Sequence, residues 1–226
     1  MNRRRWIPLA LLLGAAGLGL DAGWLHAKAW LAQQLLNDAW QAAIKDAKQQ
    51  PPWPWADTYP VARLSVPGLD VEQIVLAGDN GRVMAFGPGW APSSAAPGSA
   101  KGSVVISGHR DTHFAWLAEL APGDLIELES AEHGQSRRQL YWISDLRVAD
   151  SQRERLLIDD TQARLVLVTC WPFNAIRSGG TLRYVVTAIP LQRTGPLPAK
   201  QETVEPKAQD LPTRFSSARM REMTSA

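Results

Sequence analysis

Between residues 59 and 190 the chain alternates short apolar runs with glycine and proline, a pattern typical of a β domain. Turns follow the first two runs, at 67–68 and at 78–81. Further strands are expected at 102–107, 124–128, 140–144, 165–170 and 182–189, with a loop at 87–98 and a short helix at 113–120. Strands this short and regularly spaced predict a mainly β fold, either an antiparallel barrel or a sandwich.

The N-terminus has the pattern of a membrane anchor. Three arginines, at 3–5, precede residues 6–25, which are apolar apart from Asp21 and reach the roughly 20 residues needed to cross a bilayer. The basic flank at 1–5 favours an N-terminus inside. The alternative is a signal peptide cleaved after Ala27, although Leu25 fits the small-residue rule poorly at position −3. We therefore expect a single-pass protein of the inner (cytoplasmic) membrane, in contact with the lipid bilayer, whose remaining chain lies outside the cytoplasm, in the periplasm or another extracytoplasmic space.

Three further regions follow the anchor. Residues 26–58 are expected to form a helical stalk and a Pro/Trp-rich linker, with the helix ending near Lys48. The preferred interpretation is a helix that stands off or packs on the next domain, and the alternative is a helix lying on the bilayer. Residues 59–192 are expected to form one folded unit, the β domain described above. Residues 193–226 lack periodicity and are expected to be a disordered tail.

The 226 residues contain one cysteine, so an intrachain disulfide and a zinc site of several thiolates are both excluded. The net charge of +2 is too small to indicate a nucleic-acid partner. No motif for a cofactor or a metal ion is apparent, and Asp159-Asp160 is too little for a calcium site.

The single cysteine, Cys170, ends the apolar run 165–170 and is followed by Trp171-Pro172, which places it at the rim of the sheet. A lone cysteine is most often a small core residue. At a strand end of an exported protein, the alternative is a nucleophilic thiol, which needs a neighbouring base or cation.

His109 ends the run 102–107 after Gly108, so two strand ends are able to bring it to Cys170. The structural alternative is a turn histidine bound to Asp111. Arg183 begins the last run, and an antiparallel neighbour of the Cys170 strand would place it at the same rim as an oxyanion donor. The alternatives are an exposed strand arginine at this position and Arg177 in the oxyanion role.

Together these residues resemble the three signatures of sortases, the membrane-anchored cysteine transpeptidases. The matching segments are Gly108-His109-Arg110-Asp111-Thr112, Thr169-Cys170 and Arg183. The stretch LVTCWPFNAIRSGGTLRYVV is similar to the Cys-to-Arg segment of sortases from Gram-negative bacteria. The resemblance covers about residues 62–190 and implies an eight-stranded sortase β-barrel behind an N-terminal anchor helix.

The resemblance also implies a reaction. Cys170 would attack a backbone carbonyl in a sorting signal of the Leu-Pro-x-Thr-Gly (LPxTG) type, Arg183 would stabilise the oxyanion, and His109 would protonate the leaving amine. An amine acceptor would then resolve the acyl-thioester. Substrate contacts are expected from Val166 and Val168, which share the Cys170 face of their strand, and from Thr169 and Asp111.

Other classes remain at this stage. A cysteine peptidase would use the same Cys-His pair with water as acceptor, and an L,D-transpeptidase would carry a different cysteine signature. A metal-binding module would use His109, His113 and Cys170 as ligands. A non-catalytic, membrane-anchored binding module would retain its function without the thiol.

Overall fold

The computed structural model describes residues 6–132, 134–154, 161–175 and 179–191, and within them one long helix precedes eight strands. The predicted basic flank at 1–5 and tail at 193–226 lie outside the described residues. The elements are α1 (Trp6–Asp46), β1 (Pro60–Val66), β2 (Val71–Ala77), β3 (Gly89–Trp90), β4 (Ser103–Ser107), β5 (Leu125–Glu132), β6 (Gln135–Asp150), β7 (Arg164–Cys170) and β8 (Leu182–Pro190). Three short 3-10 helices lie between strands: η2 (Pro67–Leu69), η3 (Val83–Ala85) and η4 (Ala115–Glu119).

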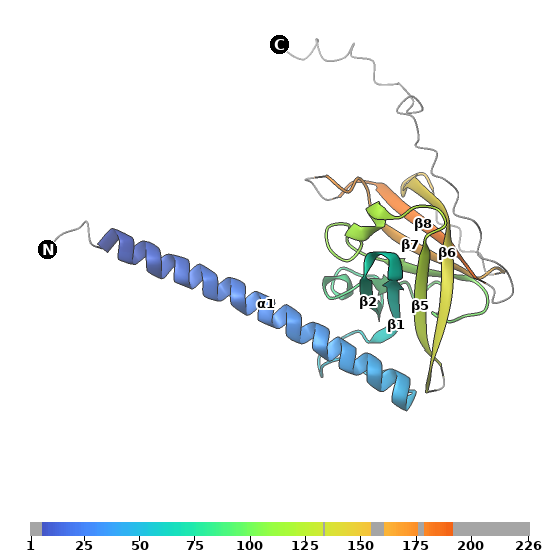
Figure 1. The fold of residues 1–226 in the computed structure, drawn as a ribbon, viewed down its shortest axis with the longest axis horizontal. Helices are drawn as coiled ribbons and strands as arrows, with labels where there is room; N and C mark the ends of the chain where they lie inside the picture. The colour runs from blue at the N-terminus through green and yellow to red at the C-terminus, as the bar shows by residue number, and fades with distance from the viewer. Residues whose placement is uncertain (1–5, 133, 155–160, 176–178, 192–226) are drawn as a thin grey trace, which may run out of the picture.

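The strands close into a barrel in the order β1-β2-β3-β4-β7-β8-β6-β5 (Figure 1). The prediction of a mainly β, eight-stranded barrel is confirmed for the described residues. Most neighbouring strands are antiparallel, but β2 pairs with β3 and β4 pairs with β7 in parallel. The parallel β4–β7 pair differs from the antiparallel expectation because the chain crosses over through β5 and β6 before it returns as β7.

Three strands depart from the sequence prediction, and one of them, β5, simply continues four residues past its expected end at 128. β3 lies inside the segment 87–98, which is expected to be a loop. The sequence does not predict this strand, because it is only two residues long and carries no apolar alternation. β6 begins five residues before the expected start at 140 and continues to Asp150. Its first four residues are exposed and polar, so they pair with β5 as a hairpin whose hydrophobic pattern is invisible in the sequence.

The barrel interior is filled by alternate residues of β4 and β7, with Val104 and Ile106 facing Leu165 and Leu167. All four side chains are at most 1% exposed. Each such burial stabilises the fold by roughly 1.5–3 kcal/mol. The alternation turns the intervening residues outward, so the packed interior determines which side chains of β7 reach the surface.

Helix α1 packs on the barrel through its C-terminal turns. Leu36, Trp40 and Ala43 form one cluster with Ile74 and with other apolar side chains of β2 and η3. The C-terminal part of the helix thus packs on the following domain, and Figure 1 shows the N-terminal half projecting away from the strands. The helix ends at Asp46, and Ala47 has the left-handed φ of 52° that commonly follows a helix.

The predicted anchor at 6–25 is continuous with the predicted stalk in α1. At residues 6–22 and 25 the structure describes the backbone and not the side chains. Within the part that is described, no helix is both long enough and apolar enough to cross a membrane. The anchor stays a prediction.

Candidate active site

Cys170 is the last residue of β7, a strand that lies between the parallel strand β4 and the antiparallel strand β8. Its thiol is free and its side chain is half-buried. Thr169 points the opposite way and is 2% exposed. The thiol therefore stands at the barrel rim, as its place before Trp171-Pro172 predicts.

His109 follows β4 and comes to the end of β7 through a short extension of the parallel ladder. The N–H of Gly108 donates to the carbonyl of Val168 at 3.1 Å, and the Thr169 hydroxyl donates to the Gly108 carbonyl at 2.7 Å. The backbone that leads into His109, whose side chain is exposed, thus lies beside the Thr169-Cys170 segment. Gly108 is required here, because a Cβ at this position would lie 2.8 Å from the ring of Phe114.

Arg183 lies directly opposite Cys170 in the β7–β8 ladder. Opposed residues of antiparallel strands have Cβ atoms about 4.5–5.5 Å apart and side chains on the same face. The Arg183 Nη1 donates to the carbonyls of Gly180, at 2.7 Å, and Leu182, at 2.9 Å. The register thus brings the predicted Cys-His-Arg set to one rim, and the competing residue, Arg177, lies outside the described residues.

Arg110 is a residue of this rim to which the sequence analysis gives no role beyond its place in the matching segment 108–112. It is 8% exposed, and its guanidinium donates to the carbonyls of Pro172, at 3.0 Å, and Ala175, at 2.7 Å. These bonds tie the segment after His109 to the loop after Cys170. The only signal in the sequence is a charged residue directly after the histidine, which is a weak one.

The predicted substrate contacts have different surroundings. Asp111 is 68% exposed, and its carboxylate accepts from Nε of Arg110 at 3.2 Å, which favours a structural role in this turn. The burial of Thr169 and its bond to Gly108 do not fit a contact with substrate. Val166 and Val168 do share the Cys170 face, where they pack in an outer apolar cluster with Ala91, Val105, Ala149 and Val185.

An aromatic cluster flanks the thiol. Trp171 stacks on Tyr184 with ring centroids 5.5 Å apart, and Phe173 meets both rings edge-on. Burial raises the pKa of the Tyr184 hydroxyl. Because Trp171 follows Cys170 and Tyr184 follows Arg183, this packing holds the ends of β7 and β8 together beside the site.

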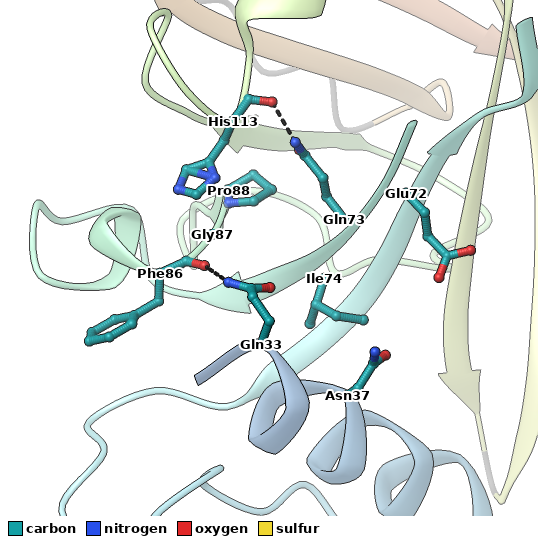
Figure 2. A pocket seen from close by; sticks show the side chains of 9 residues that line it. All are labelled: Gln33, Asn37, Glu72, Gln73, Ile74, Phe86, Gly87, Pro88 and His113. Carbon is teal, nitrogen blue, oxygen red and sulfur yellow. Dashed lines mark hydrogen bonds between the residues drawn. The ribbon is translucent and has the colours of Figure 1, made fainter. Parts of the chain in front are cut away.

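A pocket of about 270 Å³ lies between α1 and the barrel (Figure 2). His113 forms one wall. Its burial, and next the charge of His109, lower the pKa of the His113 imidazole.

Among the described residues, no group of three or more histidine, cysteine, aspartate or glutamate side chains lies close enough together to hold a metal ion. Asp159 and Asp160 lie outside the described residues.

Comparison with known proteins gives one consistent result. The sortase domain family matches residues 64–191. Sortase D of Bacillus subtilis (strain 168) is 27% identical over 124 residues, which are 54% of this chain and 60% of that protein. The chain therefore spans less than two thirds of the length of this relative.

Solved structures show the same fold. A sortase D5 transpeptidase from Clostridium perfringens superposes with a TM-score of 0.57 at 18% identity, covering 72% of this chain and 99% of the other. Sortase A from Corynebacterium diphtheriae gives a TM-score of 0.52 at 20% identity, covering 71% and 84%. These relatives do not support the prediction that sortases of Gram-negative bacteria are the closest ones.

Proposed function

Because the chain belongs to the sortase family, we propose that it is a cysteine transpeptidase acting through an acyl-thioester on Cys170. The observation that carries the proposal is the position of Cys170 at the end of β7, directly opposite Arg183 and next to the segment that bears His109. A nucleophile, a proton carrier and a fixed cation at one rim are the groups that acyl transfer requires.

In the first half of the reaction the Cys170 thiol passes its proton to His109, and the thiolate sulfur bonds to a backbone carbonyl carbon of the substrate. The Arg183 guanidinium donates hydrogen bonds to the oxygen as it becomes an oxyanion, a role that suits its planar, permanently charged fork. The C–N bond then breaks, and His109 as imidazolium gives its proton to the leaving amine.

In the second half, an acceptor amine attacks the thioester carbonyl while His109 takes a proton from it. The C–S bond breaks and the thiol is restored. We expect the substrate to be a protein with a C-terminal sorting signal of the LPxTG type. Val166 and Val168 are expected to line the floor of its groove, since they share the face of Cys170.

The membrane part of the proposal rests on the sequence. An anchor at 6–25 would hold the enzyme at the inner membrane with its barrel on the periplasmic side, beside substrates that carry apolar C-terminal tails. The basic residues at 3–5 favour that orientation.

The test uses the full chain in a mild detergent, with LPxTG-type peptides varied at each motif position and with glycinamide as the amine. We expect a covalent acyl-enzyme by mass spectrometry and an amide product, both lost in Cys170→Ala. Absence of any acyl-enzyme across the peptide set would overturn the proposal. Formation of hydrolysis product alone, at every amine concentration, would instead identify a cysteine peptidase.

A further inference from the structure

Arg110 is a charged side chain that the protein buries beside the catalytic rim. It directly follows His109 and is 8% exposed, whereas arginine is rarely buried unless its donors are paired. The proposed reaction uses Cys170, His109 and Arg183 and leaves Arg110 without a role. What its guanidinium contacts therefore shows what this buried cation does at the rim.

The turn after Cys170 receives two hydrogen bonds from this side chain. Nη1 of Arg110 donates to the Pro172 carbonyl at 3.0 Å, and Nη2 donates to the Ala175 carbonyl at 2.7 Å. The same two residues also close the turn, since the N–H of Ala175 donates to the Pro172 carbonyl at 3.3 Å. Both ends of one turn are thus held by the two terminal nitrogens of one planar guanidinium, and we call this pair of bonds the Arg110 clamp.

The third nitrogen of Arg110 contributes less to this arrangement. Its Nε donates to the carboxylate of Asp111 at 3.2 Å, but that carboxylate is 68% exposed and screened by water. The two bonds of the clamp come from a buried charged donor, and such bonds are roughly twice as strong as neutral ones. The clamp is therefore the main restraint that this side chain places on the rim.

His109 and Cys170 each lie between two points at which their segments are joined. On the strand side, the hydrogen bonds described above join Gly108 to the end of β7. On the loop side, Arg110 joins the same segment to the turn at 172–175. Two segments joined at one point are able to pivot about it, whereas joints on both sides of the reacting pair fix the separation of the two residues.

From this arrangement, we propose that Arg110 is a positioning residue for transpeptidation, and that its clamp on the turn after the thiol fixes the distance between His109 and Cys170. The proposal rests on the transpeptidase function above, in which the thiol passes its proton to His109. A base has to lie within hydrogen-bond reach of the proton it takes, and a displacement of about 1 Å lowers a rate by up to about 100-fold. The clamp therefore acts on proton transfer and not on the affinity for the substrate.

Arg63 offers a matched control for a buried arginine that only stabilises the fold. Its side chain is 18% exposed and contacts the carboxylates of Glu72, at 3.3 Å, and Glu129, at 3.8 Å. It lies on β1, which is opposite β7 in the closed barrel. Lysine at either position keeps the charge but presents a single nitrogen in place of the planar fork. Arg63→Lys and Arg110→Lys thus make the same chemical change away from the rim and at the rim.

The first test uses the thiol itself as the probe. Cys170 is the one cysteine in the chain, so iodoacetamide reports on this thiol alone, and the thiolate is the form that reacts. At pH 7 we expect alkylation of the full chain to be at least threefold slower in Arg110→Lys and in His109→Gln than in the wild type. Adding Arg110→Lys to His109→Gln should cause no further loss, because Arg110 acts through His109, and Arg63→Lys should keep the wild-type rate.

Three outcomes of this test would overturn the positioning role. They are wild-type alkylation in Arg110→Lys, an equal loss in Arg63→Lys, and a further loss of the same size when Arg110→Lys is added to His109→Gln. Acylation by an LPxTG-type peptide gives a second measurement. In Arg110→Lys we expect its maximal rate to fall at least tenfold, while the peptide concentration for half-maximal rate stays within twofold; a change confined to that concentration would also refute the proposal.

A third measurement needs no variant, so it decides the clamp even if Arg110→Lys does not fold. In the wild-type chain, the NMR signals of the Arg110 Nη1 and Nη2 groups should be separate and slow to exchange with solvent, because a guanidinium bound at both nitrogens rotates slowly. One averaged, rapidly exchanging signal would refute the clamp. Neither this measurement nor alkylation uses a sorting peptide, so failure of the transpeptidase function shows separately, as absence of an acyl-enzyme in the wild-type chain.

Discussion

Replacing Thr169 by valine tests whether a buried hydroxyl sets the position of His109. Valine keeps the shape of the side chain and its strand propensity, but it removes the 2.7 Å hydrogen bond to the Gly108 carbonyl. That bond is the last link between β7 and the backbone that leads into His109. The substitution therefore tests the position of His109 while it leaves His109, Cys170 and Arg183 themselves unchanged.

The magnitude follows from burial. A hydrogen bond contributes about 1 kcal/mol net, and a buried carbonyl left without its donor costs about 1–3 kcal/mol. Because Thr169 is 2% exposed, water does not replace the hydroxyl, and we expect Thr169→Val to lower the free energy of unfolding by about 1–3 kcal/mol. A displacement of His109 by about 1 Å would lower the acylation rate by up to about 100-fold.

The assays are urea unfolding followed by tryptophan fluorescence, and pre-steady-state acyl-enzyme formation by mass spectrometry. Thr169→Ser restores the hydroxyl and is expected to recover the acylation rate. Thr187→Val makes the same chemical change on β8 opposite Val166, away from the rim, and is expected to leave acylation unchanged. Acylation by Thr169→Val within twofold of the wild type would refute the positioning role, even if stability falls.

Three further predictions concern the helix, the arginine and the buried histidine. Trp40→Ala removes a fully buried ring between α1 and the barrel and should lower the free energy of unfolding by about 3–5 kcal/mol. Amide hydrogen exchange should then rise in the last turns of α1 but not in β7, and unchanged exchange in α1 would contradict the packing of this helix on the barrel. Arg183→Lys should lower the acylation rate at least tenfold, because one ammonium does not replace the planar fork, whereas Arg147→Lys, in an exposed ion pair on β6, should keep it; similar losses in both would argue against an oxyanion role. Burial and the charge of His109 lower the pKa of His113 below its ordinary 6.5, so the folded protein loses stability as the pH falls below about 6.5 towards the folded-state pKa. The His113→Gln variant should therefore show a smaller drop in Tm between pH 7.5 and pH 5 than the wild type, and an equal drop would refute this reasoning.

The sequence predicts the barrel well because its apolar runs are short and punctuated. It also predicts an antiparallel return after Cys170 that brings Arg183 to the same rim, whereas the direct pairing of Arg183 with Cys170 comes from the structure. It does not predict β3 or the first part of β6. Those segments are held by hydrogen bonds to neighbouring strands, and neither has a hydrophobic alternation of its own.

The parts of the site that escape prediction depend on contacts distant in sequence. Arg110 acts on carbonyls 62 and 65 residues away. A polar side chain that bonds a backbone carbonyl has no characteristic partner type, so spacing in the sequence does not reveal it. Reactive residues at strand ends are easier to find, because the ends of adjacent strands are brought together by the sheet itself.

The position of the thiol depends on the register of one strand. In β7, Leu165, Leu167 and Thr169 face inward while Val166, Val168 and Cys170 face outward. A slip of one residue would exchange the two sets, burying the thiol and turning two leucines to the surface. Each exposed leucine would lose roughly 1.5–3 kcal/mol of burial, so the slip is strongly disfavoured. Because β4 and β8 pair with β7 along the same residues, the core packing that sets this register also brings His109 and Arg183 to Cys170.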